Sequence, residues 1–225
     1  MNTQYTFTDR AEAGRLLAHA LPPLDPHETV VLALPRGGVP VAEQICKARH
    51  LPLDLVFVRK IGVPGQPELA VGAIVDGDKP HVTINHRIMH ATGLSETEVS
   101  AMGRALLPEI DRRRQLYLSA IKRPDVRGKT AVVVDDGVAT GATMRASLLA
   151  LRSRGVAKVI LALPTAPPDV LPSLTCLADQ TVCLEQPPYF TAVGAAYRDF
   201  PQTTDAEVVA ALGRCAKWTT NPGEP

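Results

Sequence analysis

Short apolar runs rich in Val, Leu and Ile alternate along the chain with segments whose apolar residues recur at helical spacing. The runs have the length of strands and are nearly continuous, which is typical of strands buried on both faces of a parallel sheet. Such an alternation predicts an α/β fold with a mostly parallel sheet flanked by helices. The predicted strands cover residues 29–35, 53–58, 130–136, 158–164 and 180–184.

Helical patterns separate these runs. A first helix is predicted to start after Thr8, which would cap it, with Glu12 in the first turn. A last helix should end near Trp218, and residues 219–225 are expected to fray. The other predicted helices cover residues 39–50, 95–122, 141–154 and 167–176.

Two segments interrupt the alternation. Residues 62–77 contain two Pro and four Gly, which predicts a mobile loop that enters a hairpin and acts as a lid. Residues 185–218 gather aromatic side chains ahead of the last helix, and we expect them to form a small hood or appendage over the ligand edge of the sheet. The sequence has no internal repeat, so its 225 residues are expected to form a single domain.

The net charge and the cysteines exclude several kinds of partner and site. With 24 basic and 23 acidic side chains, the net charge of +1 argues against nucleic acid or an acidic membrane as partner. No apolar stretch approaches the roughly 20 residues of a membrane span, and the first residues do not resemble a secretion signal, so the expected location is cytoplasmic. The cysteines lack metal-site spacing and are predicted to be reduced structural thiols: Cys46, Cys176, Cys183 and Cys215.

The most informative stretch is AVVVDDGVATGAT, residues 131–143. Asp135 and Asp136 follow an apolar strand, and a turn of small residues then leads into a helix. Ligands of parallel sheets bind at the carboxyl ends of the strands, and the amides at a helix N-terminus favour anions. The stretch therefore predicts a sugar phosphate site, with carboxylates for the hydroxyls and amides for the phosphate.

Two further strand ends carry basic groups. Pro35-Arg36-Gly37-Gly38 follows the first strand, where the glycines allow close approach and Arg36 suits a phosphate. Arg59 and Lys60 follow the second strand and open the Gly/Pro-rich segment. Together the three strand ends suit a ligand with two anionic groups and a polar middle.

These stretches resemble the type I phosphoribosyltransferases. AVVVDDGVATGAT is similar to the phosphoribosyl pyrophosphate motif of that family, LALPRGGVPVA to its pyrophosphate loop, and VRKIGVPGQPELAVGAI to its flexible loop. With YFTAVGAAYRDF near the end, the pattern resembles the "predicted phosphoribosyltransferase" subgroup over about residues 5–215. The resemblance implies a hood, dependence on Mg²⁺, a homodimer, and transfer of a 5-phosphoribosyl group to a small acceptor such as a nucleobase, with loss of pyrophosphate.

The resemblance also assigns roles. Asp135 and Asp136 would hold the ribose hydroxyls and contact a Mg²⁺ carried mainly by the substrate, and with Arg59 and Lys60 they form the candidate catalytic set. The pyrophosphate would meet Arg36, Gly37 and Gly38, with added charge from Arg59 and Lys60 of the same subunit or of its dimer partner. The 5′-phosphate would bind the amides of the loop and two of its hydroxyls, through Gly137, Val138, Ala139, Thr140, Gly141, Ala142 and Thr143.

One position departs from part of the family. Enzymes for 6-oxopurines carry an acid where this chain has Ala139, as adenine and uracil enzymes do, so hypoxanthine and guanine are not expected as acceptors. The alternative to an enzyme is a sensor that binds phosphoribosyl pyrophosphate without turnover. A haloacid dehalogenase-type phosphatase is disfavoured, because its two acids are spaced to project to one side of the strand, and Asp135 and Asp136 are adjacent.

Simpler interpretations exist for other motifs. His86 and His90 have the spacing of a metal pair on one helix face but lack a third ligand. Residues 112–114 are all Arg on a predicted helix that also carries Glu109, which favours a salt-bridged solvent face. Four aromatic residues either stack on a base or form a small core under the tail, the second being favoured: Tyr189, Phe190, Tyr197 and Phe200.

Overall fold

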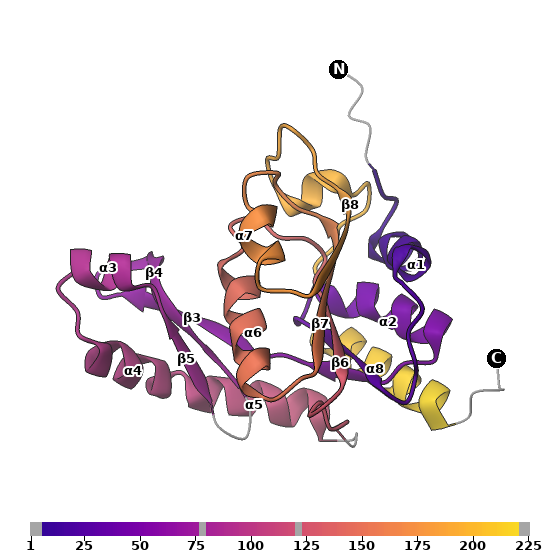
Figure 1. Ribbon diagram of the computed structural model, residues 1–225, viewed down its shortest axis with the longest axis horizontal. Coiled ribbons are helices and arrows are strands. Elements are labelled where there is room, and N and C mark those ends of the chain that lie inside the picture. The colour runs from indigo at the N-terminus through magenta and orange to yellow at the C-terminus, as the bar shows by residue number, and fades with distance from the viewer. Residues whose placement is uncertain (1–5, 77–79, 120–122, 221–225) are drawn as a thin grey trace.

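A five-stranded parallel sheet forms the centre of the protein (Figure 1). The computed structural model describes residues 6–76, 80–119 and 123–220. The strand order is β2-β1-β6-β7-β8, which confirms the predicted α/β class and its parallel sheet. The strands are β1 (Thr29–Ala33), β2 (Leu53–Leu55), β6 (Thr130–Val134), β7 (Lys158–Thr165) and β8 (Gln180–Glu185).

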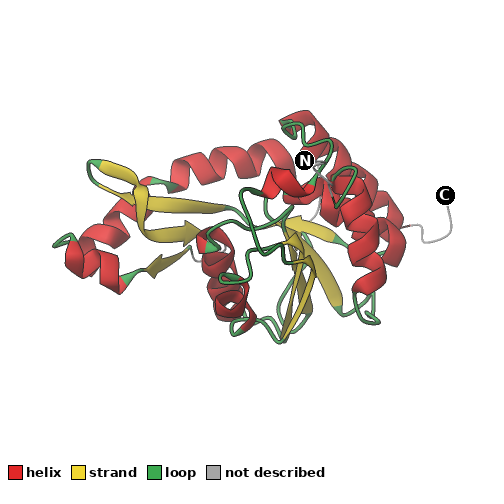
Figure 2. Ribbon diagram, turned by 90° about the horizontal axis from the view of Figure 1, so that it is seen from above, coloured by secondary structure: helices red, strands yellow, loops and turns green. Residues whose placement is uncertain are grey.

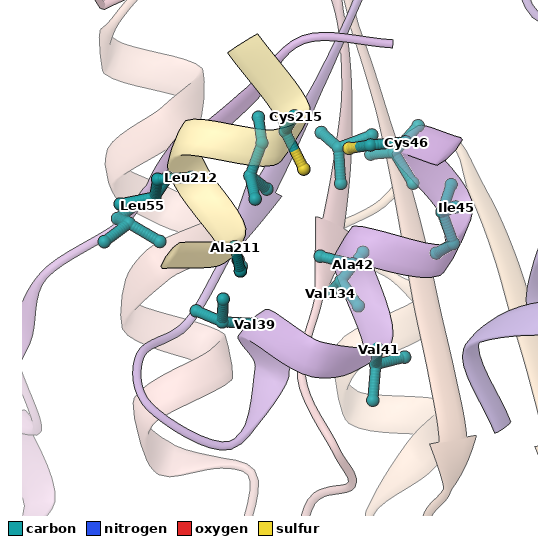
Figure 3. Close-up of a cluster of buried hydrophobic side chains, with 14 of the residues drawn as sticks. Val39, Val41, Ala42, Ile45, Cys46, Leu55, Val134, Ala211, Leu212 and Cys215 are labelled. Atoms are coloured by element: carbon teal, nitrogen blue, oxygen red, sulfur yellow. The ribbon is translucent and has the colours of Figure 1, made fainter. Parts of the chain in front are cut away.

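Helices cover both faces of this sheet (Figure 1). One face carries α1 (Arg10–Ala20), α2 (Gly38–Arg49) and α8 (Asp205–Thr220), and the other carries α6 (Ala142–Ser153) and α7 (Leu171–Thr175). Figure 3 shows α2 and α8 together over the sheet, with Val39 and Ala211 between them. Because α2 follows β1 and α6 follows the neighbouring β6, the connections diverge to opposite faces between these two strands, which is where doubly wound sheets bind ligands.

A second, antiparallel sheet lies to one side of the main sheet (Figure 2). Ile61, Val71, Met89 and Val99 form its own small core. The elements of this lobe are β3 (Val58–Val63), β4 (Gln66–Val75), β5 (His81–Ile84), α3 (His86–Ala91) and α4 (Glu96–Ala105), followed by α5 (Leu107–Leu118).

The prediction of a mobile loop entering a hairpin over residues 62–77 was right about the hairpin and, for the described part, wrong about the extent of the loop. The segment is a hairpin in which β3 and β4 pair from Val58 and Val75 down to the turn, with register shifts around Gly62. Gly72 allows β4 and β5 to lie close together, because a Cβ at this position would overlap the carbonyl oxygen of Thr83 on β5. Gly77 lies outside the described residues.

Helix boundaries also differ from the predictions. The single helix predicted over 95–122 is two helices, α4 and α5, which meet at Leu106 with Pro108 in the first turn of the second. Its predicted last residues, 120–122, lie outside the described chain. The cap of α1 is Asp9 rather than Thr8, because the Asp9 side chain accepts from the amide of Glu12. The described part of the chain contains no helix long and apolar enough to cross a bilayer.

The segment predicted as one appendage, 185–218, divides into two parts. Residues of α8, including Val208 and Leu212, are buried in the main core. The preceding part, with a 3-10 turn over Val193–Ala196, packs through Tyr197 on Phe7 at the carboxyl edge of the sheet. All four cysteines are free thiols, as predicted, and Cys46 and Cys215 lie between α2 and α8 (Figure 3).

A buried ion cluster joins the two sheets. Asp54 of β2 is fully buried and pairs with Arg123 at 2.9 Å, and Asp76 after β4 lies 3.6 Å from the same guanidinium. Asp76 also accepts from the Phe57 amide at 3.0 Å. Desolvation raises the pKa of Asp76, although the charge of Arg123 opposes the shift.

We therefore expect Arg123→Met to lower the free energy of unfolding by about 3–5 kcal/mol at pH 7, because two buried carboxylates lose their ion-pair partner. The folded-state pKa of Asp76 is raised, so the loss should be full above that pKa and shrink as the pH falls and the carboxyl takes up its proton. Urea unfolding at pH 7 and 5 measures both effects. Arg152→Met, which removes a half-exposed pair with Asp179, is the control and should cost no more than about 1 kcal/mol. Equal losses in the two variants would contradict the prediction.

Candidate functional site

The loops after β1 and β6 lie against each other at the carboxyl edge of the sheet. A Cβ on Gly37 would overlap the Asp136 carboxylate, and a Cβ on Gly38 would lie 2.9 Å from the Cα of Asp135. The peptide between Pro35 and Arg36 is cis. The structure thus brings together two of the predicted elements, the Arg-Gly-Gly loop and the acid pair, and it leaves no space for side chains at the glycines.

The predicted phosphate loop, Gly137–Thr143, turns from β6 into α6. Gly141 precedes the helix with φ of 72°, a left-handed conformation that glycine adopts without strain, and no side chain caps the helix. The amide of Val138 is used internally, since it donates to the carbonyl oxygen of Thr165 at 3.1 Å. The uncapped amides at the start of α6, together with the helix dipole, suit an anion.

The acid pair is held close and partly shielded from water. The Asp136 amide donates to Oδ1 of Asp135 at 2.9 Å. Desolvation, and after it the charge of Asp136, raise the pKa of Asp135 well above its usual range. The site therefore favours a bound proton or a cationic partner near Asp135.

Arg10 supplies a cation that no sequence pattern had indicated. Its Nε donates to Oδ2 of Asp136 at 2.8 Å, its Nη1 donates to the carbonyl oxygen of Pro201, and its guanidinium lies 3.7 Å from the centre of the Phe200 ring. Tyr197 adds a hydroxyl that donates to the backbone oxygen of Asp136 at 2.5 Å. These contacts span more than 60 positions in the sequence, so no local spacing could reveal them.

Arg36 points toward α8. Its Nη1 lies 3.4 Å from Oδ1 of Asp205, which also accepts from the Tyr117 hydroxyl at 2.5 Å. The hydrogen bond from Tyr117, with help from Arg36, lowers the pKa of Asp205, while burial and Asp205 raise the pKa of Tyr117 to about 12. About a third of the Arg36 side chain is exposed, so it is accessible to an anion.

The two basic residues of β3 are separated. Lys60 lines a cavity of about 460 Å³ together with Thr140 and Ala142 of the phosphate loop and with Arg145. Arg59 does not line this cavity, because successive strand residues point to opposite faces. The structure therefore brings Lys60, but not Arg59, beside the phosphate loop.

A wider cavity, of about 820 Å³, lies on the other side of the phosphate loop, where Ala139 and Thr140 face Tyr189 and Phe190. Tyr189 is 91% exposed, whereas Tyr197 is buried. The favoured interpretation of the aromatic segment, a small core, is thus confirmed for Tyr197 and its neighbours, and Tyr189 and Phe190 are left at a cavity.

The structure also shows the surroundings of the arginine run near Glu109 and of the two histidines. Arg112 and Arg113 both pair with Glu109 at 3.0 Å, which confirms a salt-bridged surface. His86 and His90 have ring centres 6.4 Å apart, and His86 lies 3.8 Å from Glu96. No cluster of three metal-ligating side chains occurs anywhere in residues 6–76, 80–119 and 123–220.

The close fit of the two loops predicts the effect of adding one methyl group. Gly37 has a right-handed helical backbone, so Gly37→Ala brings no backbone strain and acts only by overlap with Asp136. We expect it to lower the free energy of unfolding by about 1–3 kcal/mol. Gly213→Ala in α8 has open space and should stabilise by about 0.5–1 kcal/mol. Urea unfolding of both variants checks this, and a neutral Gly37→Ala would show that the loops do not pack as described.

Comparisons with known proteins agree with this arrangement. The model of the phosphoribosyl transferase domain family matches residues 10–171. Two Mycobacterium tuberculosis proteins, named "Putative phosphoribosyl transferase MT0597" and "Putative phosphoribosyl transferase Rv0571c", are each 46% identical over 208 residues, covering 92% of this chain but only 46% of their own length. TT1426 from Thermus thermophilus superposes with a TM-score of 0.76 at 37% identity, over 93% of this chain and 99% of that one. The chain belongs to the phosphoribosyl transferase family.

Proposed function

We propose that the protein binds phosphoribosyl pyrophosphate and, with Mg²⁺, transfers its 5-phosphoribosyl group to a small acceptor, releasing pyrophosphate. The observation that carries this proposal is the packing of the Arg36–Gly38 loop against Asp135 and Asp136, next to the uncapped start of α6. This arrangement offers two anion sites on either side of a carboxylate pair. The chain spans about half the length of its mycobacterial relatives, so the proposal concerns this domain.

The donor set fits Mg²⁺ that the substrate carries. Mg²⁺ keeps several waters and binds one or two carboxylates together with substrate phosphates. Asp135 and Asp136 are the carboxylates available at this edge, and Arg10 already occupies Oδ2 of Asp136. When bound, the ion would neutralise charge on the departing pyrophosphate.

The side chains then have separate roles. The amides of residues 139–143 would hold the 5′-phosphate, because the Val138 amide already donates to Thr165, and Asp135 and Asp136 would accept hydrogen bonds from the ribose hydroxyls. Arg36 and the amides beside it would bind the pyrophosphate, while Lys60 would add charge near the phosphate loop. Arg59 would act from the partner subunit of a homodimer. Fixed charges and positioning supply most of the rate enhancement in such a transfer.

The first test is binding. Phosphoribosyl pyrophosphate with Mg²⁺ should raise the melting temperature by mass action, and Asp135→Asn combined with Asp136→Asn should abolish this effect while the protein stays folded. Calorimetry of the parent and the double variant measures both. Absence of binding by the parent at millimolar ligand would refute the proposal, and parent-like binding by the double variant would remove the carboxylates from the site.

The raised pKa of Asp135 predicts a proton coupled to binding. Hydroxyl donors and Mg²⁺ require the carboxylate form, so ligand binding should release a proton, tighten as the pH rises through this pKa, and weaken as the pH falls below it. Calorimetry in two buffers of different ionisation enthalpy measures the proton release. An affinity that does not rise with pH, together with no proton release, would contradict the role of Asp135.

The acceptor should be small, planar or an amine, and different from hypoxanthine and guanine, because Ala139 replaces the acid that serves 6-oxopurines. The cavity beside Ala139 presents Tyr189 and Phe190, and stacking of one base on an aromatic ring is worth about 1–3 kcal/mol. A panel of nucleobases and metabolite extracts, assayed by pyrophosphate release, should identify it, and Tyr189→Ala should then raise KM for the acceptor without changing affinity for phosphoribosyl pyrophosphate. Turnover with hypoxanthine or guanine would refute this exclusion. Tight binding without turnover on any acceptor would establish the sensor instead.

A further inference from the structure

A second basic cavity lies far from the proposed site. It has a volume of about 700 Å³ and is lined by Arg114, Arg123, Arg127 and Arg154 together with His81 and Asp125. Arg154 ends α6, whose first residue, Ala142, belongs to the phosphate loop. A helix of 12 residues is about 18 Å long, so this arginine cavity lies at the opposite end of α6 from that loop.

Within the described residues, the positive charges around the arginine cavity are only partly balanced by carboxylates. Arg123 is neutralised by Asp54 and Asp76. Arg114, Arg127 and Arg154 form no ion pair within 4 Å with the residues that the structure describes. The lining carboxylate of Asp125 is exposed, and its Oδ1 accepts from the backbone amide of Arg127. Desolvation raises the pKa of Asp76, and the charge of Arg154 opposes this rise, so Arg154 is partly compensated in this way. Arg114 and Arg127 add two further guanidinium groups to the same cavity, and these favour a bound anion.

An unpaired donor in the arginine cavity also favours a bound anion. Nη1 of Arg154 is buried and has no hydrogen-bond partner. Gly155 follows Arg154 in the chain, and the aliphatic part of the Arg127 side chain lies over it. A Cβ added to Gly155 would be 3.5 Å from Cγ of Arg127. Buried donors almost always have a partner. A water molecule could accept the hydrogen bond of Nη1, but it would not offset the positive charge of the arginine side chains.

We propose that the arginine cavity binds a small phosphorylated molecule. Guanidinium groups form paired hydrogen bonds with phosphate oxygens, and they stay charged at every physiological pH. A protein with a net charge of +1 lacks the extended basic surface that a nucleic-acid partner requires, and the volume of this open cavity matches that of small-molecule sites. This site is separate from the proposed active site and does not depend on its activity.

Titration with inorganic pyrophosphate in the absence of Mg²⁺ tests the proposal. Calorimetry should show binding, and amide resonances of Arg154 and Gly155 should shift during the titration. Arg127→Gln and Arg154→Gln should each weaken this binding about tenfold or more, because each removes a charged donor. Arg127 is exposed, so its substitution should leave the fold intact even if Arg154→Gln destabilises it.

Two variants serve as controls. Arg152→Gln removes a nearby arginine of α6 that pairs with Asp179 instead, and Arg36→Gln removes the arginine of the proposed active site. Both should keep the shifts of Arg154 and Gly155 unchanged. No pyrophosphate binding, binding unaffected by Arg127→Gln, or loss of these shifts in Arg36→Gln would overturn the proposal. Failure of the proposed transferase would appear separately, as absent binding of phosphoribosyl pyrophosphate with Mg²⁺ alongside intact pyrophosphate binding here.

Discussion

The packing of the β1 loop on the β6 loop is the constraint on which the site depends. The two strands are hydrogen-bonded neighbours in register from Thr29 and Thr130 to Ala33 and Val134, so the chain segments that leave them must share the same space. They can do so because residues 37 and 38 lack side chains, while α2 and α6 depart to opposite faces of the sheet. An arginine-bearing loop and a carboxylate pair thereby meet at one edge without crossing helices.

This close approach also sets the electrostatics. Two adjacent carboxylates beside a packed loop are poorly solvated, which explains the raised pKa of Asp135. Arg10 offsets part of the charge through Asp136, and the Phe200 ring and the Pro201 carbonyl fix the position of its guanidinium. The N-terminal helix and the segment after β8 therefore act together to hold one carboxylate, so the integrity of the site depends on residues at both ends of the described chain.

Much of the main sheet and of the candidate site could be predicted from the sequence, because the patterns that indicate them lie within short stretches of the chain. Continuous apolar runs identified all five parallel strands, and the acid pair followed by small residues pointed to the carboxyl edge of the sheet, where we propose that the ligand binds. The sequence predicts a hairpin near residues 62–77 but gives its strands too little length, because Gly and Pro normally interrupt strands, whereas here Gly72 makes room for the neighbouring strand. Contacts such as Arg10 with Asp136 and Arg36 with Asp205 join residues more than 100 positions apart, and a single sequence carries no record of such pairs.

Helix α6 connects the two basic regions of the molecule. Its first turn provides uncapped amides and therefore partial positive charge, which favours an anion, and Arg145 adds a basic side chain to the cavity there. Its last turn carries partial negative charge, which stabilises Arg152 and Arg154 there. The dipole thus accounts for arginine side chains near the C-terminal end, but it extends only over about one turn and cannot neutralise Arg114 and Arg127, which come from other elements. Neither guanidinium forms an ion pair with a residue that the structure describes, so an anion bound in the cavity at this end of α6 would interact favourably with both.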